Sequence, residues 1–368
     1  MGGSSASDRS CARMLTIQSR EHPYAVEPAT TLLSAVAKAC AGRSIFALVD
    51  RTVARLYKSD LRGLDFARTL AVTADEPNKS YERIAPLLHG LITAGFRRDS
   101  GLLVIGGGVV QDIGCFIASI LLRGCRWEFI PTTLLAQGDS CIGSKSSINI
   151  AGFKNQLGTF YPPRRVHLVT SVLKTLAPDD IRSGIGEIVK LALVDGKKPW
   201  ERLQADLRRL SRDPADEILL RKMILDSLAI KKNYIEKDEF DHGIRNLLNY
   251  GHTFGHAYES VTKYAIPHGI AVLLGMGTAT FISEKIGFVP PGTFHRLDRV
   301  FRPFYQPFEE KLPKVGLPRF IDTMKLDKKN NGGKINCILT RGVGRMEKIA
   351  MTPEQLLPLV ASALMEYQ

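Results

Sequence analysis

The sequence lacks any apolar run that reaches the roughly 18 residues of a membrane-spanning helix. Its first residues, MGGSSASDRSCAR, contain no apolar core of the kind a secretory signal has, and their Gly and Ser content indicates a disordered tail over residues 1–14. The six cysteines form no CxxC pair, and several stand among apolar residues. Cysteines scattered in this way are typical of reduced thiols. We therefore expect a cytoplasmic protein that does not enter a membrane.

Acidic residues are the scarcer charged class, with 37 Asp and Glu against 50 Lys and Arg and a formal net charge of +13. This excess admits a nucleic acid as partner, although Lys and Arg neither form runs nor alternate with aromatic residues. A positive field that attracts a multiply charged anionic substrate explains the charge as well. We expect the small anionic molecule and no nucleic acid.

The chain has no internal repeat, and its 368 residues suffice for two domains. Short apolar runs at 45–50, 102–105 and 128–130 predict buried parallel strands. Beyond Pro178 the pattern is helical almost to the end. We predict an α/β domain over residues 15–177 and a helical domain over residues 178–368.

Three glycines follow the predicted strand at 102–105 and lead into a helical pattern: Gly106, Gly107 and Gly108. At such a junction, glycines let N–H groups of the helix N-terminus approach a pyrophosphate. The run is not a GxGxxG motif, so a tight structural turn is the alternative. A second polar segment follows the strand at 128–130 and contains Asp139, Lys145, Lys154 and Asn155. Lysines in such loops are usually solvated, but their place after a strand favours an anion pocket.

Three of the eight histidines fall within seventeen residues, at positions 252, 256 and 268. His252 and His256 are four apart, so both project from one face of a helix. His268 lies in an IPHGIA turn where a helix can begin. Each histidine could instead bond separately to a backbone carbonyl, but their convergence favours a divalent metal, which needs a carboxylate as well. The best candidate is Glu187, although Glu187 and Lys190, one helical turn apart, could form a structural ion pair.

Taken together, these motifs resemble 3-dehydroquinate synthases and related sugar phosphate cyclases. The likeness runs from about residue 45 to about residue 344 and includes GGGVVQD, PTTLLAQGDS, GEIVK, GIRNLLNYGHTFGHAYE and PHGIAV at family spacing. It implies a Rossmann-like NAD-binding α/β domain followed by an all-helical metal-binding domain. It also implies a homodimer in which Arg123, within an LRG motif, reaches into the neighbouring subunit's site.

The resemblance further implies a role for individual residues. A zinc or cobalt ion would be bound by Glu187, His252 and His268, which leaves His256 to face the substrate. NAD would contact Asp50, Glu76, Lys79, Gly107, Gly108, Asp112, Thr132, Thr133, Lys145, Lys154, Thr175 and Asp180. The substrate would contact Arg123, Asp139, Lys145, Asn155, Lys190, Lys231, Arg245, Asn249, His256 and either Lys328 or Lys329.

The implied reaction oxidises a substrate alcohol, eliminates phosphate, returns the hydride and closes a carbocycle, so it is redox-neutral overall. Lys231 and Arg245 match the family's carboxylate-binding pair, which favours the 2-keto acid phosphate DAHP as substrate. Gln111, where a glycine is usual, and the serines of SKSSIN at 144–149 depart from the pattern. They leave open a cyclase of sedoheptulose 7-phosphate or glucose 6-phosphate (an epi-valiolone or 2-deoxy-scyllo-inosose synthase). A metal-dependent alcohol or glycerol dehydrogenase, which would not need the phosphate-binding residues, is a more remote alternative.

Overall fold

The computed structural model of the protein describes residues 14–213, 216–312, 317–325 and 333–367. The chain forms two compact units. Unit 1 comprises Met1–Leu176 and Lys231–Phe240, and unit 2 comprises Ala177–Ile230 and Asp241–Gln368. Apart from Met14, the predicted tail over 1–14 lies outside the described residues.

Unit 1 is built around a seven-stranded sheet with the order β1-β2-β9-β6-β5-β3-β4. All neighbouring strands pair in parallel except β1 and β2, which are antiparallel. The predicted strands at 45–50, 102–105 and 128–130 are confirmed as β3, β5 and β6. The seven strands are β1 (Leu15–Ile17), β2 (Tyr24–Pro28), β3 (Ile45–Asp50), β4 (Thr69–Val72), β5 (Gly101–Gly106), β6 (Arg126–Pro131) and β9 (Arg165–Leu168).

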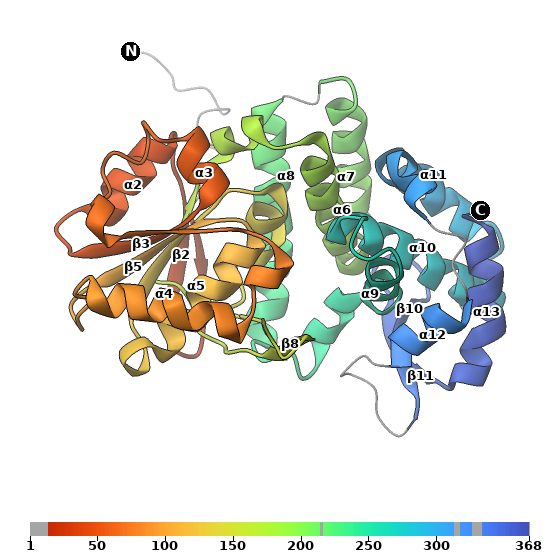
Figure 1. The fold of residues 1–368 in the computed structure, drawn as a ribbon. Coiled ribbons are helices and arrows are strands. Elements are labelled where there is room, and N and C mark those ends of the chain that lie inside the picture. Colours follow the sequence, from red (N-terminus) through yellow and green to blue (C-terminus); the bar gives the residue numbers. More distant parts are fainter. Residues whose placement is uncertain (1–13, 214–215, 313–316, 326–332, 368) are drawn as a thin grey trace, which may run out of the picture. The chain divides into compact units, whose positions relative to one another are not determined.

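Helices cover both faces of this sheet (Figure 1). On one face, α2 packs through Val36 in an apolar cluster with Leu103 of β5. On the other, Gly114 of α5 lies against Val104, where an added Cβ would stand 2.4 Å from Val104 Cγ2. Successive strand residues point to opposite faces, which is why a sheet covered on both sides reads as a continuous apolar run. The helices of unit 1 are α2 (Leu32–Cys40), α3 (Arg51–Leu56), α4 (Tyr81–Thr93) and α5 (Gly108–Ile120).

Short elements in unit 1 connect the strands and helices. A small antiparallel pair is formed by β7 (Ile148–Ile150) and β8 (Phe153–Leu157). A single π-helical turn, η4 (Ala136–Ser140), follows β6. The 3-10 turns are η1 (Phe66–Arg68), η2 (Glu76–Asn78), η3 (Leu121–Arg123) and η5 (Thr170–Thr175). Because parallel strands end at one edge of a sheet, η2 after β4 and η4 after β6 bring polar side chains to the edge where ligands bind in such sheets.

Unit 2 is mainly helical, which confirms the predicted helical C-terminal region. It also contains one antiparallel hairpin, β10 (Ile335–Thr340) and β11 (Met346–Met351), so it is not all-helical. A short apolar run such as INCILT cannot be assigned to helix or strand from periodicity. The helices are α6 (Pro178–Asp195), α7 (Lys197–Leu210), α8 (Glu217–Lys237), α9 (His252–Val261), α10 (His268–Lys285), α11 (Thr293–Tyr305), α12 (Leu317–Lys325) and α13 (Pro353–Met365), with 3-10 turns η6 (Ile244–Asn249) and η7 (Gln306–Lys311). The end of α8, from Lys231 on, belongs to unit 1.

Helix α10 is the centre of unit 2 and is buried continuously from Gly269 to Ser283. Its glycines permit backbone contact with two neighbouring helices. A Cβ on Gly269 would lie 1.8 Å from the carbonyl oxygen of Ser183 in α6, and one on Gly275 would lie 2.0 Å from that of Gly251, just before α9. Helix packing this close is possible only where a side chain is absent.

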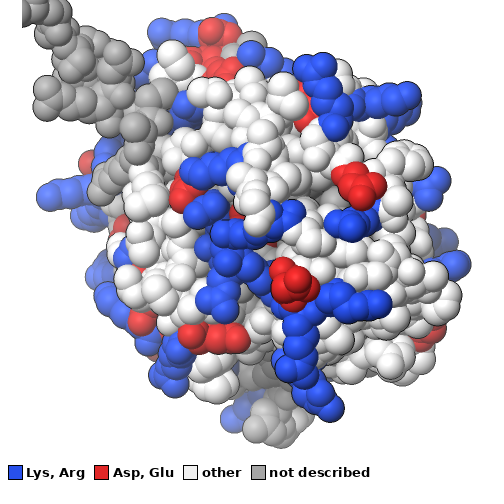
Figure 2. All heavy atoms as spheres, turned by 90° about the vertical axis from the view of Figure 1, so that its left-hand side faces the viewer, with Lys and Arg blue, Asp and Glu red and all other residues white. Residues whose placement is uncertain are grey.

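Basic side chains are prominent on the surface. Figure 2 shows Lys and Arg gathered across the middle of one face, with few acidic side chains among them. In unit 1, the buried carboxylate of Glu128 lies close to three arginines. The distances are 3.0 Å to Arg43, 3.6 Å to Arg126 and 3.9 Å to Arg165. Among the described helices, none is long and apolar enough to cross a membrane.

Candidate functional site

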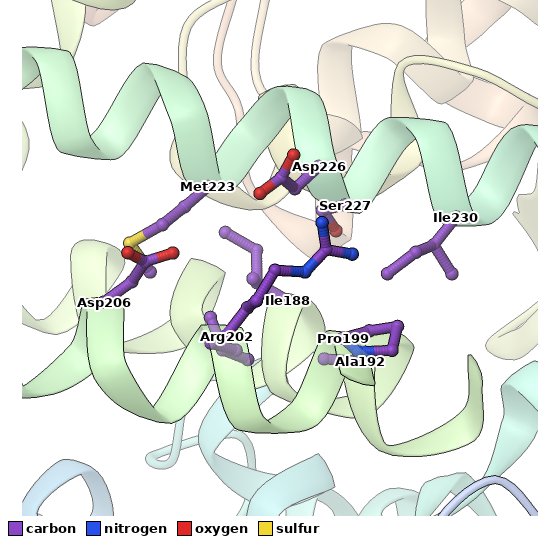
Figure 3. Close-up of a pocket in the computed structure, with 10 residues that line it drawn as sticks. Ile188, Ala192, Pro199, Arg202, Asp206, Met223, Asp226, Ser227 and Ile230 are labelled. Atoms are coloured by element: carbon purple, nitrogen blue, oxygen red, sulfur yellow. The ribbon is translucent and has the colours of Figure 1, made fainter. Parts of the chain in front are cut away.

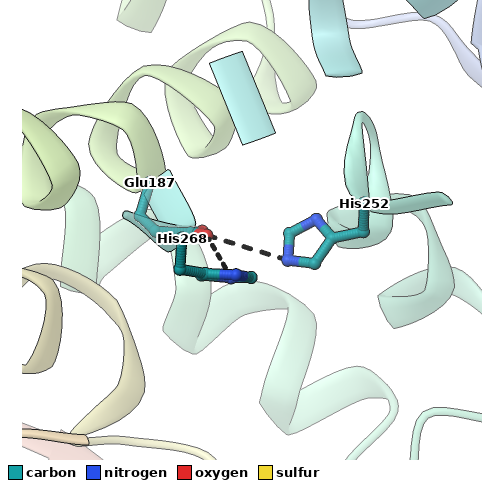
Figure 4. A group of neighbouring side chains, drawn as sticks. All are labelled: Glu187, His252 and His268. Atoms are coloured by element: carbon teal, nitrogen blue, oxygen red, sulfur yellow. Dashed lines mark ion pairs between the residues drawn. The ribbon is translucent and has the colours of Figure 1, made fainter. Parts of the chain in front are cut away.

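Glu187, His252 and His268 converge within unit 2 (Figure 4). Nε2 of His268 lies 3.2 Å from Oε1 of Glu187, and Nε2 of His252 lies 3.7 Å from the same oxygen. The three potential ligand atoms all lie within 4.8 Å of one another. The structure therefore brings together three residues that are 65 and 16 positions apart in the chain.

Glycines beside these residues explain how they meet. Gly186 precedes Glu187, and a Cβ there would stand 2.2 Å from the carbonyl oxygen of Gly269. Gly269 in turn follows His268 at the start of α10. Gly251, with a left-handed φ of 82°, precedes His252 at the start of α9. The three side chains are thus held by helices that approach backbone to backbone, and a larger residue at any of these glycines would separate them.

Hydrogen bonds fix the orientation of both imidazoles. Nδ1 of His268 lies 3.2 Å from Oε2 of Glu259, and Nδ1 of His252 lies 3.4 Å from the carbonyl oxygen of Tyr250. A carboxylate and a carbonyl only accept hydrogen bonds, so each Nδ1 is the donor. In the metal-free protein Nε2 of His268 donates to Oε1 of Glu187. Once that proton is released, each Nε2 would offer its lone pair on the side of Glu187, as a metal ligand requires.

The geometry and charge of this group fit a divalent metal ion. Tetrahedral zinc with ligand distances of 2.0–2.2 Å separates its ligand atoms by about 3.4 Å. The observed 3.2 and 3.7 Å lie on either side of that value. Burial would lower the pKa of His268, but Glu259 and Glu187 outweigh it and raise the pKa to about 10. The negative potential that holds a proton there would favour a cation.

A second group in unit 2 has comparable spacing and comprises His256, Glu259 and His268. It shares His268 with the first group, and it would need Glu259 as a ligand. Glu259 already accepts from Nδ1 of His268, and unlike Glu187, which is 1% exposed, it is only partly buried. We therefore favour the group that contains Glu187 as the metal site, with His256 beside it, its ring 5.5 Å from that of His252.

Other predicted substrate residues of unit 2 lie on α6 and on η6. Lys190 contacts Oε2 of Glu187, while Oε1 of Glu187 faces the histidines. Glu187 can therefore form an ion pair with Lys190 and also serve as a metal ligand, although these were predicted as alternatives. Arg245 is buried, and it lies with Asn249 on η6, just before α9. Asn249 donates to the carbonyl oxygen of Asn246 at 3.0 Å.

In unit 1, packing requires the glycine turn between β5 and α5, and its role in pyrophosphate binding stays a prediction. An added Cβ would stand 2.6 Å from Val110 Cβ at Gly106 and 2.7 Å from Thr133 Cγ2 at Gly107, so packing alone requires these two glycines. At Gly108 the nearest atom would be Ser140 Oγ, at 3.8 Å. The N-terminus of α5 has no side-chain cap within the described part of the chain. Its N–H groups at Gly108 can therefore approach an anion.

Several predicted NAD contacts form one charged cluster in unit 1. Lys79 Nζ donates to Asp112 at 3.2 Å and to Asn155 at 3.1 Å, and lies 3.6 Å from Glu76. Lys154 lies 3.4 Å from the same glutamate. Burial raises the pKa of Asp112 to about 6, against the opposing effect of Lys79. A mixed cluster of this kind can donate to phosphate and accept from hydroxyls.

The remaining predicted NAD residues already have local contacts. Asp50 caps α3 by accepting from the Thr52 N–H at 2.7 Å. Thr133 accepts from the Ala136 N–H at 3.2 Å, and the Thr132 N–H donates to Gly106. Thr175 lies 3.0 Å from the hydroxyl of Tyr57. Burial and the neighbouring Asp179 raise the pKa of Asp180, at the start of α6 in unit 2.

Predicted substrate residues of unit 1 fall into a buried and an exposed group. Asp139 lies on η4 and is buried with Lys231, whose Nζ is 2.5 Å from its carboxylate and 2.8 Å from its carbonyl oxygen. Lys145 is exposed, 5.7 Å above the ring of Phe160. Arg123 is exposed and has a left-handed φ of 67°. Lys328 and Lys329 lie outside the described residues.

The serines of SKSSIN have structural partners. Ser144, with a φ of 58°, donates to Glu239 at 3.0 Å, and Glu239 also accepts from Ser19 at 2.5 Å. Ser146 lies 2.8 Å from the hydroxyl of Thr159. These contacts hold the segment that carries Lys145.

The sequence-based predictions missed two residues with site contacts. Glu259 lies two helical turns after His252, which places its carboxylate on the same helix face as the histidines. This contact could therefore have been predicted from the spacing. Gln111 was noted only as a departure, yet its amide makes two hydrogen bonds to Ser140. Nothing in the sequence indicates that pairing, because the two residues are 29 positions apart.

A hollow of about 310 Å³, partly open to solvent, lies between α6, α7 and α8 (Figure 3). Its polar members include Asp206, which is already paired with Lys222 at 2.5 Å. Most of its wall is aliphatic, and it contains none of the predicted site residues. The lining residues are Ile188, Ala192, Pro199, Arg202, Leu203, Asp206, Met223, Asp226, Ser227 and Ile230.

Comparisons with known proteins identify relatives over most of the chain. The model of the 3-dehydroquinate synthase N-terminal family matches residues 69–183, and that of the 3-dehydroquinate synthase C-terminal family matches residues 184–330. A 3-dehydroquinate synthase of Alkaliphilus metalliredigens is 33% identical over 347 residues, which cover 93% of this chain and 96% of the relative. One of Dictyoglomus thermophilum is 37% identical over 82% of this chain and 83% of its own.

Solved structures confirm the predicted fold class. A 2-deoxy-scyllo-inosose synthase complexed with carbaglucose-6-phosphate, NAD⁺ and Co²⁺ has a TM-score of 0.81 and 19% identity, covering 95% of this chain and 100% of its own. A 2-epi-5-epi-valiolone synthase from Streptomyces hygroscopicus with NAD⁺ and Zn²⁺ bound has a TM-score of 0.81 and 23% identity, covering 95% and 98%. At these identities the likeness concerns the fold.

Proposed function

The chain belongs to the 3-dehydroquinate synthase family, and from that premise we propose that it converts DAHP to 3-dehydroquinate with release of inorganic phosphate. The observation that carries the proposal is the convergence of Glu187, His252 and His268, with both imidazoles oriented for metal binding. The cofactors are NAD and a divalent ion, zinc or cobalt. When bound, they supply a hydride acceptor and a Lewis acid.

The residues of unit 2 would prepare the reacting centre. Glu187, His252 and His268 would hold the ion. Lys190, in contact with Oε2 of Glu187, fixes that carboxylate so that Oε1 faces the two imidazoles. His256 projects beside His252, where it would accept or return a proton of the substrate.

The cationic residues would bind the two anionic groups of the substrate. A carboxylate buried in a pocket needs cationic partners, and a guanidinium fork such as that of Arg245 suits it best. We assign the carboxylate to Arg245 and Lys231. The phosphate and hydroxyl groups are assigned to Arg123, Asp139, Lys145, Asn155, Asn249 and one of Lys328 and Lys329.

The nucleotide is assigned to the edge of the unit 1 sheet. Gly107 and Gly108 would receive the pyrophosphate at the N-terminus of α5. Asp50 would accept from the adenosine ribose, which disfavours NADP because its 2′-phosphate would be repelled. The other proposed contacts are Glu76, Lys79, Asp112, Thr132, Thr133, Lys145, Lys154, Thr175 and Asp180.

One observation favours a second candidate function, the cyclisation of an uncarboxylated sugar phosphate. Lys231 is already ion-paired with Asp139 at 2.5 Å, and this partner would compete with a substrate carboxylate. Sedoheptulose 7-phosphate and glucose 6-phosphate are the substrates to compare. A dehydrogenase role is not proposed, because the chain belongs to a cyclase family.

Phosphate release from a panel of substrates, with NAD and zinc or cobalt present, tests these alternatives. The proposal expects stoichiometric phosphate and 3-dehydroquinate from DAHP, with no net NADH. Turnover of sedoheptulose 7-phosphate or glucose 6-phosphate alone would replace it with the second candidate. Net NADH without phosphate would refute both.

The proposed setting is a cytoplasmic homodimer with NAD binding assigned to residues 15–177 and metal binding to residues 178–368. Light scattering during gel filtration would test the dimer. If Arg123 completes the partner's site, mixing an Arg123→Ala variant with an inactive His268→Ala variant would restore part of the activity. A monomeric, active protein would contradict this assignment.

A further inference from the structure

Gln111 and Ser140 form a two-point clamp in unit 1. Gln111 lies in the first turn of α5 and is 6% exposed. Its Nε2 donates to the carbonyl oxygen of Ser140 at 2.6 Å, and the Ser140 hydroxyl donates to its Oε1, also at 2.6 Å. A carbonyl only accepts, so the amide can lie in just one orientation.

Ser140 ends the π-helical turn η4 that carries Asp139. The beginning of that turn is held by Gln137, whose amide donates to the carbonyl oxygens of Pro131 and Val169 at 3.0 and 2.9 Å. Gln111 holds the end. Asp139 lies between these two anchors and receives Lys231 on both its carboxylate and its carbonyl oxygen. A π-turn is rare, and such turns often mark functional sites.

The same clamp reaches the glycine turn. The backbone N–H of Gln111 donates to the carbonyl oxygen of Gly107 at 3.0 Å. Ser140 Oγ is the atom nearest to the position of a Cβ on Gly108, at 3.8 Å. Gln111 therefore bonds through its backbone to the turn assigned to NAD and through its side chain to the segment that carries Asp139.

We propose that Gln111 is a positioning residue that couples the glycine turn to Asp139 and Lys231. It fixes the end of η4, so that the Asp139–Lys231 pair keeps one place relative to the N-terminus of α5. Its effect on turnover rests on the proposed cyclase function. Its effect on η4 does not, because that follows from the hydrogen bonds alone.

The informative variant is Gln111→Met, which keeps the length of the side chain and removes both hydrogen bonds. Loss of two buried hydrogen bonds is expected to lower kcat/KM for DAHP roughly tenfold or more. Hydrogen–deuterium exchange should accelerate in a peptide that covers residues 134–142 and stay unchanged in α2 and β3. The Kd for NAD should change less than about threefold, since the backbone bond to Gly107 remains.

Two further variants and a control sharpen the test. Ser140→Ala removes one of the two bonds and should give a smaller loss, and the double variant should lose no more than Gln111→Met alone. Gln111→Glu keeps an acceptor for the serine hydroxyl, but its second carboxylate oxygen would face the carbonyl oxygen of Ser140, so its loss of kcat/KM should be at least as large as that of Gln111→Met. The matched control is Gln18→Met, at an exposed position of unit 1, which should behave as the unmodified protein.

The outcomes separate the clamp from the function. Unchanged exchange in 134–142 would overturn the clamp. Faster exchange with unchanged kcat/KM would leave the clamp and overturn the positioning role, because Gln111 would then be merely structural. Loss of NAD affinity with full kcat at saturating NAD would overturn the coupling. If the unmodified protein releases phosphate from no substrate while exchange in Gln111→Met accelerates locally, the proposed function fails and the clamp stands.

Discussion

The carboxylate of Glu259 lies 3.2 Å from Nδ1 of His268, on the side of the ring opposite to Glu187. The two carboxylates thus bracket one imidazole, and each faces a different nitrogen. Metal-binding histidines in proteins are commonly held this way, by an acceptor that fixes the tautomer and raises the basicity of the ligand nitrogen. Glu259 is therefore expected to control metal affinity without touching the metal.

Replacing Glu259 with Gln tests that role. The amide can present its NH₂ group to Nδ1 and allow the wrong tautomer, so zinc affinity is expected to fall roughly ten- to a hundredfold. The measurement is competition with a chromophoric chelator. The matched control is Glu201→Gln, on an exposed position of α7, which should bind zinc normally. Equal zinc affinity in the two variants would show that Glu259 does not orient His268.

The ion pair of Glu187 and Lys190 is buried, with side-chain exposures of 2% and 4%. Replacing Glu187 with Gln leaves a buried ammonium without its counter-charge, so the metal-free protein is expected to lose about 3–5 kcal/mol of unfolding free energy. Lys190→Met in the same chain should restore much of it, because both charges are then gone. Urea denaturation provides the measurement, and a double variant as unstable as Glu187→Gln would refute this account.

The close packing of α10 predicts that no side chain larger than that of glycine is tolerated at Gly269. Gly269→Ala would place a methyl group 1.8 Å from the carbonyl oxygen of Ser183, where only backbone movement can relieve the clash. We expect a loss of about 3 kcal/mol or more in stability together with weaker zinc binding. Gly63→Ala is the control, since its Cβ would make only an ordinary contact of 3.4 Å with Val36. A Gly269→Ala protein with normal zinc affinity would mean that this contact does not set the geometry of the metal site.

The carboxyl group of Asp112 has a pKa raised from 3.8 to about 6, mainly by burial. A raised folded-state pKa favours the protonated form, so its contribution to stability is complete below about pH 4 and is lost as pH rises through about 6. The shift of about 2 units corresponds to at most roughly 3 kcal/mol. Asp112→Asn should therefore flatten the change in unfolding free energy between pH 4 and 6, measured by urea denaturation without NAD. Parallel curves for the two proteins would contradict the raised pKa.

Local patterns predicted much of the fold. Apolar runs that end in Asp50 and in Gly106 are strands because a strand buried on both faces needs no alternation. The histidine pair at 252 and 256 fell on a helix as its spacing requires. The hairpin at 335–351 was not predicted, because a six-residue apolar run is compatible with either a helix or a strand.

Less of the candidate site than of the fold could be predicted from the sequence. Residue types and spacing indicated a metal with Glu187 as the best carboxylate candidate, and the resemblance implied the same ligand, but the contacts that orient the side chains are long-range. The pairing of Gln111 with Ser140 spans 29 positions, and the stacking of Gly186 on Gly269 spans 83. Neither follows from local propensity, because each depends on how separate helices pack. Asp50 caps α3 at the strand end where a contact to NAD was predicted, and that contact stays a prediction.

Arg245 provides the sharpest test of substrate class. It is 6% exposed on η6, and a buried guanidinium contributes most when it meets a carboxylate in a two-pronged contact. Arg245→Ala would remove a charge-assisted hydrogen bond of about 1.5–3 kcal/mol, so kcat/KM for DAHP is expected to fall ten- to a hundredfold or more. The loss for sedoheptulose 7-phosphate, which has no carboxylate, should be much smaller, and steady-state phosphate release measures both. Equal losses for the two substrates would assign Arg245 to the protein's own stability. An unmodified enzyme that cyclises sedoheptulose 7-phosphate but not DAHP would replace the 3-dehydroquinate synthase proposal with the second candidate.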